Sequence, residues 1–289
     1  KDMEDNPRVQ FVYHDLKYEF HLGIREKIGD VDYILHLAAN SNVDRSITHP
    51  REFFEDNVMG TVSLLEYMRL YQPKARFINF NTDEVYGPTN GKDIGYVEWS
   101  PIVPSNTYAA SKACQEAICV SYWRTYNVPL IIVNMMNNFG EMQSASKYPV
   151  MIQKAVAKGE EIIIHGDDMG IGSRSYIHSR NASDAMLFII KKLSPYLHEA
   201  GVVDRPLRYN IAGDKQLDNL ELAQMIADLM GKKLKYKLVN FHQTRSGHDK
   251  HYGLNDTKLK SLGWKPPLTF EESLKNTIEW QTANKQWIE

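Results

Sequence analysis

The sequence predicts an α/β protein built on a doubly wound parallel sheet, together with a smaller α/β lobe. In the first half of the chain, short apolar runs alternate with longer amphipathic stretches. Alternation of this kind favours parallel strands whose connecting helices cover both faces of a sheet. After residue 140 the regular repetition stops, so we assign most of the second half to a separate lobe.

The elements of the first half follow from apolar content and from punctuation by Gly and Pro. Short runs rich in Val, Ile, Leu and aromatic residues predict strands, and longer amphipathic runs predict helices. The strands fall at residues 9–13, 33–37, 77–80 and 130–133, and the helices at 19–28, 51–71 and 107–126. Gly87-Pro88, Pro101 and Pro104 mark a long loop before the last of these helices. Long ordered loops are often functional.

The second half mixes helices and strands without a regular order. We predict a helix at 148–158, a strand at 161–165, and helices at 220–230 and 270–282. Another helix is expected to begin at Asn181, because an asparagine side chain can cap a helix start. The chain is expected to cross back to the first lobe around residues 171–195.

Composition limits the possible partners. The chain carries 34 basic and 36 acidic residues, a formal charge of −2, so no overall field recruits nucleic acid or an anionic membrane. Cys114 and Cys119 lie on different faces of one predicted helix and cannot form a bridge with each other, which favours a reducing compartment. No apolar run approaches the ~18 residues of a membrane span. We expect a soluble cytoplasmic protein without a bound metal.

Tyr108 and Lys112 form the first candidate catalytic pair. They lie four residues apart in a small-residue run that favours helix, so they share one helix face. A neighbouring ammonium stabilises a phenolate and lowers the tyrosine pKa toward the range of a useful base. The spacing alone is weak evidence, because Tyr13 and Lys17 repeat it where we expect a strand and a turn.

A second candidate group follows the strand at 77–80. Thr82, Asp83 and Glu84 would lie beyond its carboxyl end, where parallel sheets bind ligands. Thr82 and Asp83 could simply cap a turn, but a cap does not require two carboxylates in succession. Adjacent carboxylates in a confined pocket tend to raise one pKa and leave the other group ionised, which gives an acid and a base.

These two groups resemble a known family when they are taken together. Thr82-Asp83-Glu84-Val85-Tyr86-Gly87, followed by Tyr108-x-x-x-Lys112, resembles the extended short-chain dehydrogenase/reductases, and most closely their dTDP-glucose 4,6-dehydratases. Epimerases of the family share the tyrosine–lysine pair but usually lack the Asp-Glu doublet. The likeness extends to residues 36–46, Asn57-x-x-Gly60-Thr61, Asn137-Asn138-Phe139-Gly140, residues 245–249 and residues 262–266.

The resemblance implies a Rossmann-like NAD-binding domain at residues 1–140, to which 171–195 cross back. Residues 141–170 and 196–289 would form the nucleotide-sugar lobe. The family's glycine-rich turn, which meets the pyrophosphate of a dinucleotide, is absent from this sequence. We expect residues that precede Lys1 in the molecule to supply it.

The resemblance also implies roles in dehydrating a nucleotide-activated hexose to its 4-keto-6-deoxy form. Tyr108 would accept the O4 proton while C4 gives a hydride to NAD, Lys112 would tune Tyr108 and hold the nicotinamide ribose, and Thr82 would orient O4. Glu84 would remove the C5 proton, and a protonated Asp83 would supply the departing C6 hydroxyl with a proton.

Binding residues are implied in the same way. Asp15, Ala38 and Ala39 would contact the cofactor, although a turn and ordinary strand-end packing explain them equally well. For the nucleotide, the candidates are Asn137, Arg174, Asn210, Arg245 and His248, of which Arg174 suits bidentate phosphate contact. Asn57 is expected to be buried and to hydrogen-bond across strands. The helices at 51–71 and 107–126 would form a homodimer.

Several positions depart from the family pattern. Asn81 replaces a small serine and Glu141 a proline, and residues 143–148 and 178–181 also diverge. All but Asn81 touch the nucleotide-sugar lobe rather than the chemistry, so the substrate base could be thymine, uracil or another. Two alternatives stay open: an epimerase of the same family, and a non-catalytic nucleotide-sugar binder, which the absent glycine-rich turn suggests.

Overall fold

The computed structural model describes residues 5–89, 95–168, 170–240 and 248–287. The chain forms two compact units, each built from three segments. The first unit comprises residues 1–80, 107–132 and 195–207, and the second comprises 81–106, 133–194 and 208–289. The domain boundaries expected from the family resemblance stay a prediction.

A five-stranded sheet confirms the predicted α/β class. Its strand order is β1-β2-β3-β9-β8. β1 and β2 are parallel, with Tyr33 opposite Arg76, whereas the short β8 pairs with β9 in the antiparallel direction. The strands are β1 (Tyr33–His36), β2 (Arg76–Thr82), β3 (Leu130–Met135), β8 (His198–Glu199) and β9 (Arg205–Ile211).

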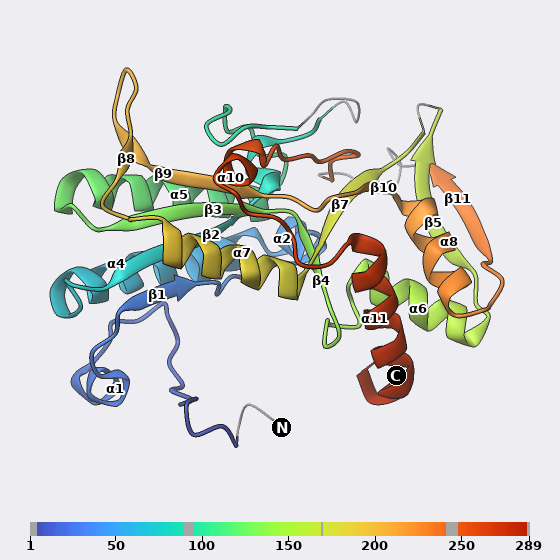
Figure 1. Ribbon diagram of the computed structural model, residues 1–289, viewed down its shortest axis with the longest axis horizontal. Coiled ribbons are helices and arrows are strands. Elements are labelled where there is room, and N and C mark those ends of the chain that lie inside the picture. The colour runs from blue at the N-terminus through green and yellow to red at the C-terminus, as the bar shows by residue number, and fades with distance from the viewer. Residues whose placement is uncertain (1–4, 90–94, 169, 241–247, 288–289) are drawn as a thin grey trace. The chain divides into compact units, whose positions relative to one another are not determined.

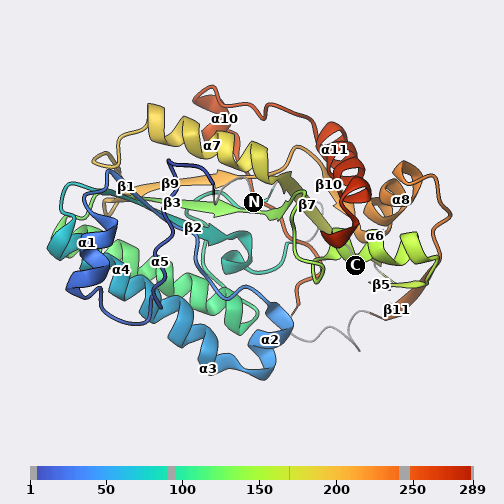
Figure 2. The ribbon, with the colours of Figure 1, turned by 90° about the horizontal axis from the view of Figure 1, so that it is seen from below.

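The helices of the first unit pack around a shared apolar core. α4 and α5 run side by side (Figure 2), and their apolar faces join Phe77 of β2 and Leu130 and Ile132 of β3 in one cluster of buried side chains. The helices are α1 (Leu22–Ile28), α2 (Val43–Thr48), α3 (Pro50–Phe53), the π-helical η1 (Phe54–Met59), α4 (Gly60–Tyr71) and α5 (Thr107–Tyr126).

The strand predicted at residues 9–13 is wrong. The segment is irregular and pairs with no strand in the part of the chain that the structure describes. Because no neighbouring strand pairs with this segment, its aromatic side chains stay open to solvent: Phe11 is 53% exposed and Tyr13 is 89% exposed. Alternating apolar residues therefore indicate a strand only where a partner strand satisfies the backbone.

The second unit contains two three-stranded sheets, of order β10-β7-β4 and β11-β5-β6. β5 and β11 run parallel beside each other (Figure 1). The strands are β4 (Asn137–Phe139), β5 (Ile162–Asp167), β6 (Gly170–Ile171), β7 (Ser173–His178), β10 (Gln216–Asp218) and β11 (Tyr236–Asn240). The helices are η2 (Asp83–Tyr86), α6 (Tyr148–Lys158), α7 (Ser179–Lys192), α8 (Asn219–Leu229), α10 (Thr257–Ser261), α11 (Phe270–Ala283) and η3 (Lys285–Trp287).

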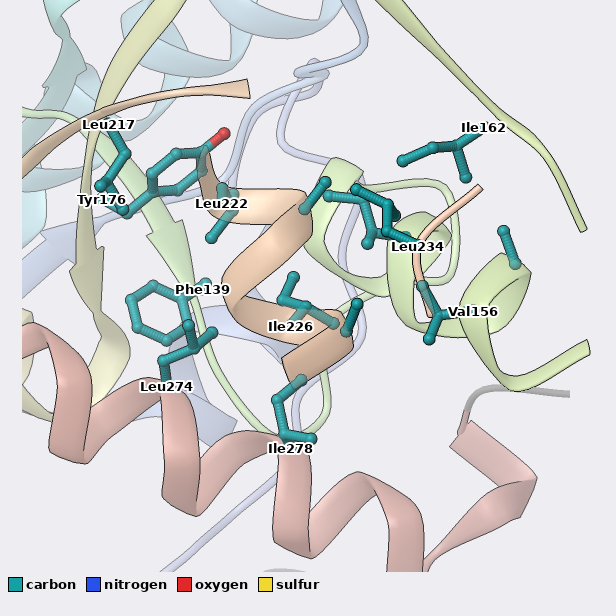
Figure 3. Close-up of a cluster of buried hydrophobic side chains, with 14 of the residues drawn as sticks. Phe139, Val156, Ile162, Tyr176, Leu217, Leu222, Ile226, Leu234, Leu274 and Ile278 are labelled. Atoms are coloured by element: carbon teal, nitrogen blue, oxygen red, sulfur yellow. The ribbon is translucent and has the colours of Figure 1, made fainter. Parts of the chain in front are cut away.

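A hydrophobic cluster holds the second unit together. Figure 3 shows Ile226 of α8, Leu274 and Ile278 of α11, and the rings of Phe139 and Tyr176 turned toward a common centre. α8 and α11 both begin with a capping box, in which the cap side chain and a glutamate three residues later satisfy each other's backbone N–H groups. These caps fix where each helix enters the cluster.

The predicted start of α7 at Asn181 is wrong. The helix begins at Ser179, and the side chain of His178 accepts a hydrogen bond from the Arg180 N–H as the cap. Asn181 instead donates to the carbonyl oxygen of Leu268, which is distant in sequence. Among the described residues, none of the helices combines the length and apolar character needed to cross a membrane.

Candidate active site

The turn after β2 carries a run of three polar side chains. Thr82 ends the strand and caps the short η2 helix, where its hydroxyl accepts the Glu84 N–H. The same hydroxyl donates to Asp83 Oδ1 at 3.0 Å. Thr82 thus caps the turn, which the sequence analysis considered, and it also contacts the Asp83 carboxyl group directly.

Asp83 is held in a setting that favours its neutral form. Its side chain is buried, and burial raises the pKa of its carboxyl to about 7, with the charge of Glu84 adding to the rise. Oδ2 has no hydrogen-bond partner among the described residues. A carboxyl with one unpartnered oxygen and a pKa near neutrality can carry a proton to a ligand.

Glu84 has a different set of partners. Its Oε2 accepts hydrogen bonds from Asn106 Nδ2 and from the Tyr252 hydroxyl, both at 3.2 Å. Burial raises the pKa of Glu84, while the Asn106 hydrogen bond and the charge of Arg174 oppose that rise. Two donors on one oxygen stabilise the ionised form, so Glu84 is better suited than Asp83 to act as a base.

Arg174 lies over this group from β7. Its guanidinium is 4.1 Å from the centre of the Tyr252 ring and donates to the carbonyl oxygens of Ser173, Asp249 and Lys250. These bonds fix the orientation of the guanidinium. Its positive charge opposes the rise that burial causes in the pKa values of Asp83 and Glu84.

Sequence reasoning missed Asn106 and Tyr252. Asn106 directly precedes the predicted helix with Tyr108, and Tyr252 stands three residues after the segment 245–249 that carries the resemblance. Extending each motif by a few residues would have included both. Their role as donors to Glu84 depends on a long-range contact, 168 residues apart in the case of Tyr252, and no local pattern signals it.

Tyr108 and Lys112 lie on one helix, α5, as predicted, and α5 belongs to the first unit. Lys112 is only 3% exposed, and its Nζ donates to the Phe80 carbonyl oxygen at 2.7 Å. Burial lowers the pKa of Lys112 to about 8. Tyr108 is half-buried, with its ring edge-on to Phe53. Phe80 precedes Thr82 by two residues in β2, so one strand carries both the lysine's acceptor and the threonine.

A cavity of about 140 Å³ in the first unit brings together three residues expected to contact a cofactor. Asp15, Ala38 and Ala39 all line it, together with Leu16, Lys17, Asn40, Asp56 and Asn57. The alanines leave the backbone after β1 accessible, since a methyl group is all that covers it. One ammonium group lies between two carboxylates, beside backbone that small side chains leave accessible. These polar groups fit the polar base and ribose of a dinucleotide.

Asn57 is buried as expected, but its bonds differ from the prediction. Its side chain exchanges hydrogen bonds with the backbone of Asn40 and donates to the Ser111 hydroxyl at 2.8 Å. Ser111 in turn donates to the Tyr108 carbonyl oxygen. Asn57 therefore joins the loop after β1 to the first turn of α5 and does not bridge strands.

The remaining predicted nucleotide contacts differ in accessibility. Asn137 is exposed at the start of β4, and His248 is half-buried. Asn210 is fully buried and donates to the carbonyl oxygens of Tyr96 and Asn255. Arg245 lies outside the described residues.

A parallel sheet, a tyrosine and lysine one helical turn apart, and an Asp-Glu pair after a central strand define an extended short-chain dehydrogenase/reductase. The chain belongs to the GDP-mannose 4,6 dehydratase family, whose model matches residues 1–277.

Individual relatives agree with this assignment. The dTDP-glucose 4,6-dehydratase of Haemophilus influenzae is 34% identical over 98% of this chain and 86% of its own length. A trifunctional UDP-glucose 4,6-dehydratase of Arabidopsis thaliana is 33% identical over 98% of this chain and 40% of its own length. The crystal structure of DesIV, a dTDP-glucose 4,6-dehydratase of Streptomyces venezuelae with NAD and TYD bound, has a TM-score of 0.86 at 29% identity, covering 99% of this chain and 83% of that one.

Proposed function

We propose that this protein is an NAD-dependent hydro-lyase that converts a nucleotide-activated hexose to its 4-keto-6-deoxy derivative. The observation that carries the proposal is a pair of adjacent carboxyl groups with unequal partners, the buried Asp83 and the half-buried Glu84. An elimination needs one group to remove a proton and another to supply one. dTDP-glucose is the first candidate substrate, and UDP-glucose is the second because the Arabidopsis relative is named for it.

NAD is the proposed cofactor, and relatives crystallised with it support this choice. The cavity beside Asp15, Ala38 and Ala39 would hold its adenosine part, and Tyr108 and Lys112 would hold the nicotinamide ribose. Bound NAD would take up a hydride from C4 of the sugar and give it back at C6.

Tyr108, Lys112 and Thr82 would carry the oxidation half. Tyr108, as phenolate, takes the O4 proton as C4 becomes a ketone, and the Lys112 ammonium stabilises that phenolate. Lys112 is fixed for this role by its hydrogen bond to the Phe80 carbonyl oxygen. Thr82 hydrogen-bonds O4 and orients it toward Tyr108.

Glu84 and Asp83 would carry the elimination half. The C4 ketone acidifies the C5 proton, which Glu84 removes. The C6–O bond then breaks, and Asp83 gives its proton to the departing hydroxide so that water leaves. Glu84 returns its proton to C5 as C6 is reduced, which restores the Glu84 carboxylate. The proton that Tyr108 took from O4 replaces the one that Asp83 gave up, so that Tyr108 and Asp83 also regain their starting forms for the next turnover.

The nucleotide diphosphate would be held by Asn137, Arg174, Asn210, Arg245 and His248. Support differs among them: Asn137 is exposed and Arg174 presents an oriented cation, whereas the amide hydrogens of Asn210 already serve two carbonyls.

We also infer a cytoplasmic homodimer. α4 and α5 pack side by side and leave Leu70, Tyr71 and Tyr126 exposed, an apolar surface that a second copy would cover. The absence of a paired cysteine among the 289 residues agrees with a reducing compartment. Gel filtration with light scattering of the full-length protein should give twice the chain mass, and a monomer at micromolar concentration would contradict the dimer.

The decisive experiment incubates full-length protein and NAD with dTDP-glucose or UDP-glucose and analyses the sugar nucleotide by mass spectrometry. We expect a product that has lost one water and carries a 4-keto group. A product of unchanged mass with inverted configuration would establish an epimerase instead. Binding of the sugar nucleotide without any turnover would establish a non-catalytic binder.

A further inference from the structure

A third carboxyl group, that of Asp249, lies beside the Asp83–Glu84 pair and has no part in the proposed chemistry. The Asp249 N–H donates to the Tyr252 hydroxyl at 3.3 Å, and that hydroxyl donates to Glu84 Oε2 at 3.2 Å. One tyrosine hydroxyl therefore links the backbone of Asp249 to the proposed base. The charge of Asp249 also reaches Glu84, because it adds to the rise in the pKa of Glu84.

The backbone at Asp249 is held in place by Arg174. Nη2 of Arg174 donates to the Asp249 carbonyl oxygen at 2.7 Å, and Nη1 donates to the Lys250 carbonyl oxygen at 2.6 Å. The same guanidinium lies 4.1 Å from the centre of the Tyr252 ring. Asp249 is therefore presented from a fixed main chain, which a residue needs if it is to recognise a single group of a ligand.

The side chain of Asp249 is buried but only partly satisfied. It is 6% exposed, and its Oδ2 has no hydrogen-bond partner among the described residues. Burial raises the pKa of Asp249, while a hydrogen bond from Ser105 and the charge of Arg174 oppose that rise and favour the ionised form. A buried carboxylate oxygen without a donor costs free energy, and such an atom in a native protein requires an explanation. A ligand hydroxyl that donates to Oδ2 supplies one.

The groups around Asp249 indicate which hydroxyl that is. In the proposed function, Thr82 and Tyr108 hold O4 of the hexose. Glu84 acts at C5, and Asp83 acts on the C6 hydroxyl. The hydroxyls at C2 and C3 are then the two that the reaction does not use. C3 is two bonds from C5 around the sugar ring and C2 is three, so a carboxylate beside the base at C5 is better placed for the C3 hydroxyl.

We propose that Asp249 binds the substrate, with its Oδ2 accepting a hydrogen bond from the C3 hydroxyl of the hexose. The inference rests on the proposed function and adds a specificity-determining residue to it. An ionised carboxylate only accepts hydrogen bonds, so a sugar without a hydroxyl at C3 leaves Oδ2 buried and without a donor. The site therefore selects hexoses whose C3 hydroxyl is free. The same bond holds the ring, and with it C5, in position for Glu84.

The test measures kcat/KM of the full-length enzyme with NAD for dTDP-glucose, or UDP-glucose if that is the substrate, and for its 3-deoxy and 2-deoxy analogues. We expect the wild type to lose about 10- to 100-fold with the 3-deoxy sugar, the range that one hydrogen bond to a charged group gives. The 2-deoxy sugar should cost only a few-fold.

Asp249→Asn should reduce the penalty of the 3-deoxy sugar to a few-fold, because a neutral amide oxygen accepts a weaker hydrogen bond. Asp249→Ala, which leaves no acceptor, should remove the penalty. Damage to the structure alone would lower kcat/KM for all three sugars by the same factor and leave their ratios unchanged, so the ratios isolate the contact between Asp249 and the hydroxyl.

Asp184→Asn is the matched control. Asp184 lies on α7 and accepts a hydrogen bond from Trp264, so its variant should discriminate among the sugars as the wild type does. A wild type that accepts the 3-deoxy sugar as well as the parent sugar, a penalty that falls on the 2-deoxy sugar instead, or a full penalty in both Asp249 variants would overturn this inference alone. A wild type that dehydrates neither parent sugar nucleotide would overturn the proposed function together with it.

Discussion

Asp83 and Glu84 are chain neighbours whose roles are separated by their partners. Asp83 receives one hydrogen bond from Thr82 and has an unpartnered oxygen, while Glu84 receives two on a single oxygen. The sequence alone could predict that two carboxylates are adjacent and that their repulsion raises the pKa of one of them. Which carboxyl is better stabilised as an anion could not, because the deciding donors, Asn106 and Tyr252, reach Glu84 only in the folded chain.

Replacing Glu84 by glutamine should separate the two halves of the reaction. The amide oxygen introduced by Glu84→Gln can still accept from Asn106 and Tyr252, but the amide cannot remove the C5 proton, so elimination should fall by about 10²- to 10⁴-fold. Reduced nicotinamide, followed by its absorbance in a single turnover, should still form. Glu279→Gln on α11 serves as a control and should turn over normally; wild-type turnover by the Glu84 variant would refute its assignment as the base.

The raised pKa of Asp83 makes a prediction about stability. The folded protein binds this proton up to pH about 7, whereas the unfolded chain releases it near pH 4. Between these values the folded state holds more protons, so the contribution of Asp83 is full below pH 4 and is lost as pH rises to 7.

Asp83→Asn, which cannot ionise, should therefore be more stable than wild type at pH 8, by roughly 4 kcal/mol at most, and should lose this advantage near pH 4. Urea unfolding of both proteins at several pH values measures the difference. A stability difference that does not change with pH would show that the folded-state pKa of Asp83 is ordinary.

At the scale of elements, the best predicted helices are those with a continuous amphipathic run and clear ends. α5 and α6 span the predicted residues, 107–126 and 148–158. The region predicted as one helix at 51–71 contains α3, η1 and α4 in succession. The π-helical turn was not foreseeable, because one extra residue in a turn leaves no clear mark on the spacing of apolar residues.

The stability of the protein should depend on Asn57 in the π-helical turn. Asn57→Ala would leave the backbone N–H and carbonyl of Asn40 and the Ser111 hydroxyl without their partner. We expect a loss of about 2–4 kcal/mol in the free energy of unfolding, since several buried polar groups lose hydrogen bonds at once. Chemical denaturation measures it, with Asn276→Ala on α11 as an exposed control. A loss below about 0.5 kcal/mol, the usual limit for surface positions, would contradict this account.

At the scale of the whole molecule, the sequence correctly predicts the α/β class. The sequence did not indicate how many times the chain passes from one unit to the other. Each unit is assembled from three segments. Such returns depend on pairings like that of β3 with β9, made by residues more than seventy positions apart. Apolar periodicity identifies an element but not its distant partner.

Three strands, β2, β3 and β9, continue from one compact unit into the other. We therefore expect a single cooperative thermal transition by calorimetry, because a unit cannot unfold without disrupting strands that belong to both. Ile226→Ala in the apolar cluster of the second unit should lower the whole transition, at a cost of about 2–5 kcal/mol. Two resolved transitions, of which only one moves in the variant, would contradict this expectation.

The two cysteines of α5 differ in a way that an experimenter can use. Burial raises the pKa of the Cys119 thiol to about 12 and removes it from solvent, whereas Cys114 is only partly covered. The 289 residues thus present one addressable thiol, two positions from Lys112 on the helix that also carries Tyr108. A fluorophore attached there would give a native reporter of that helix, and no engineered cysteine would be needed to follow it during turnover.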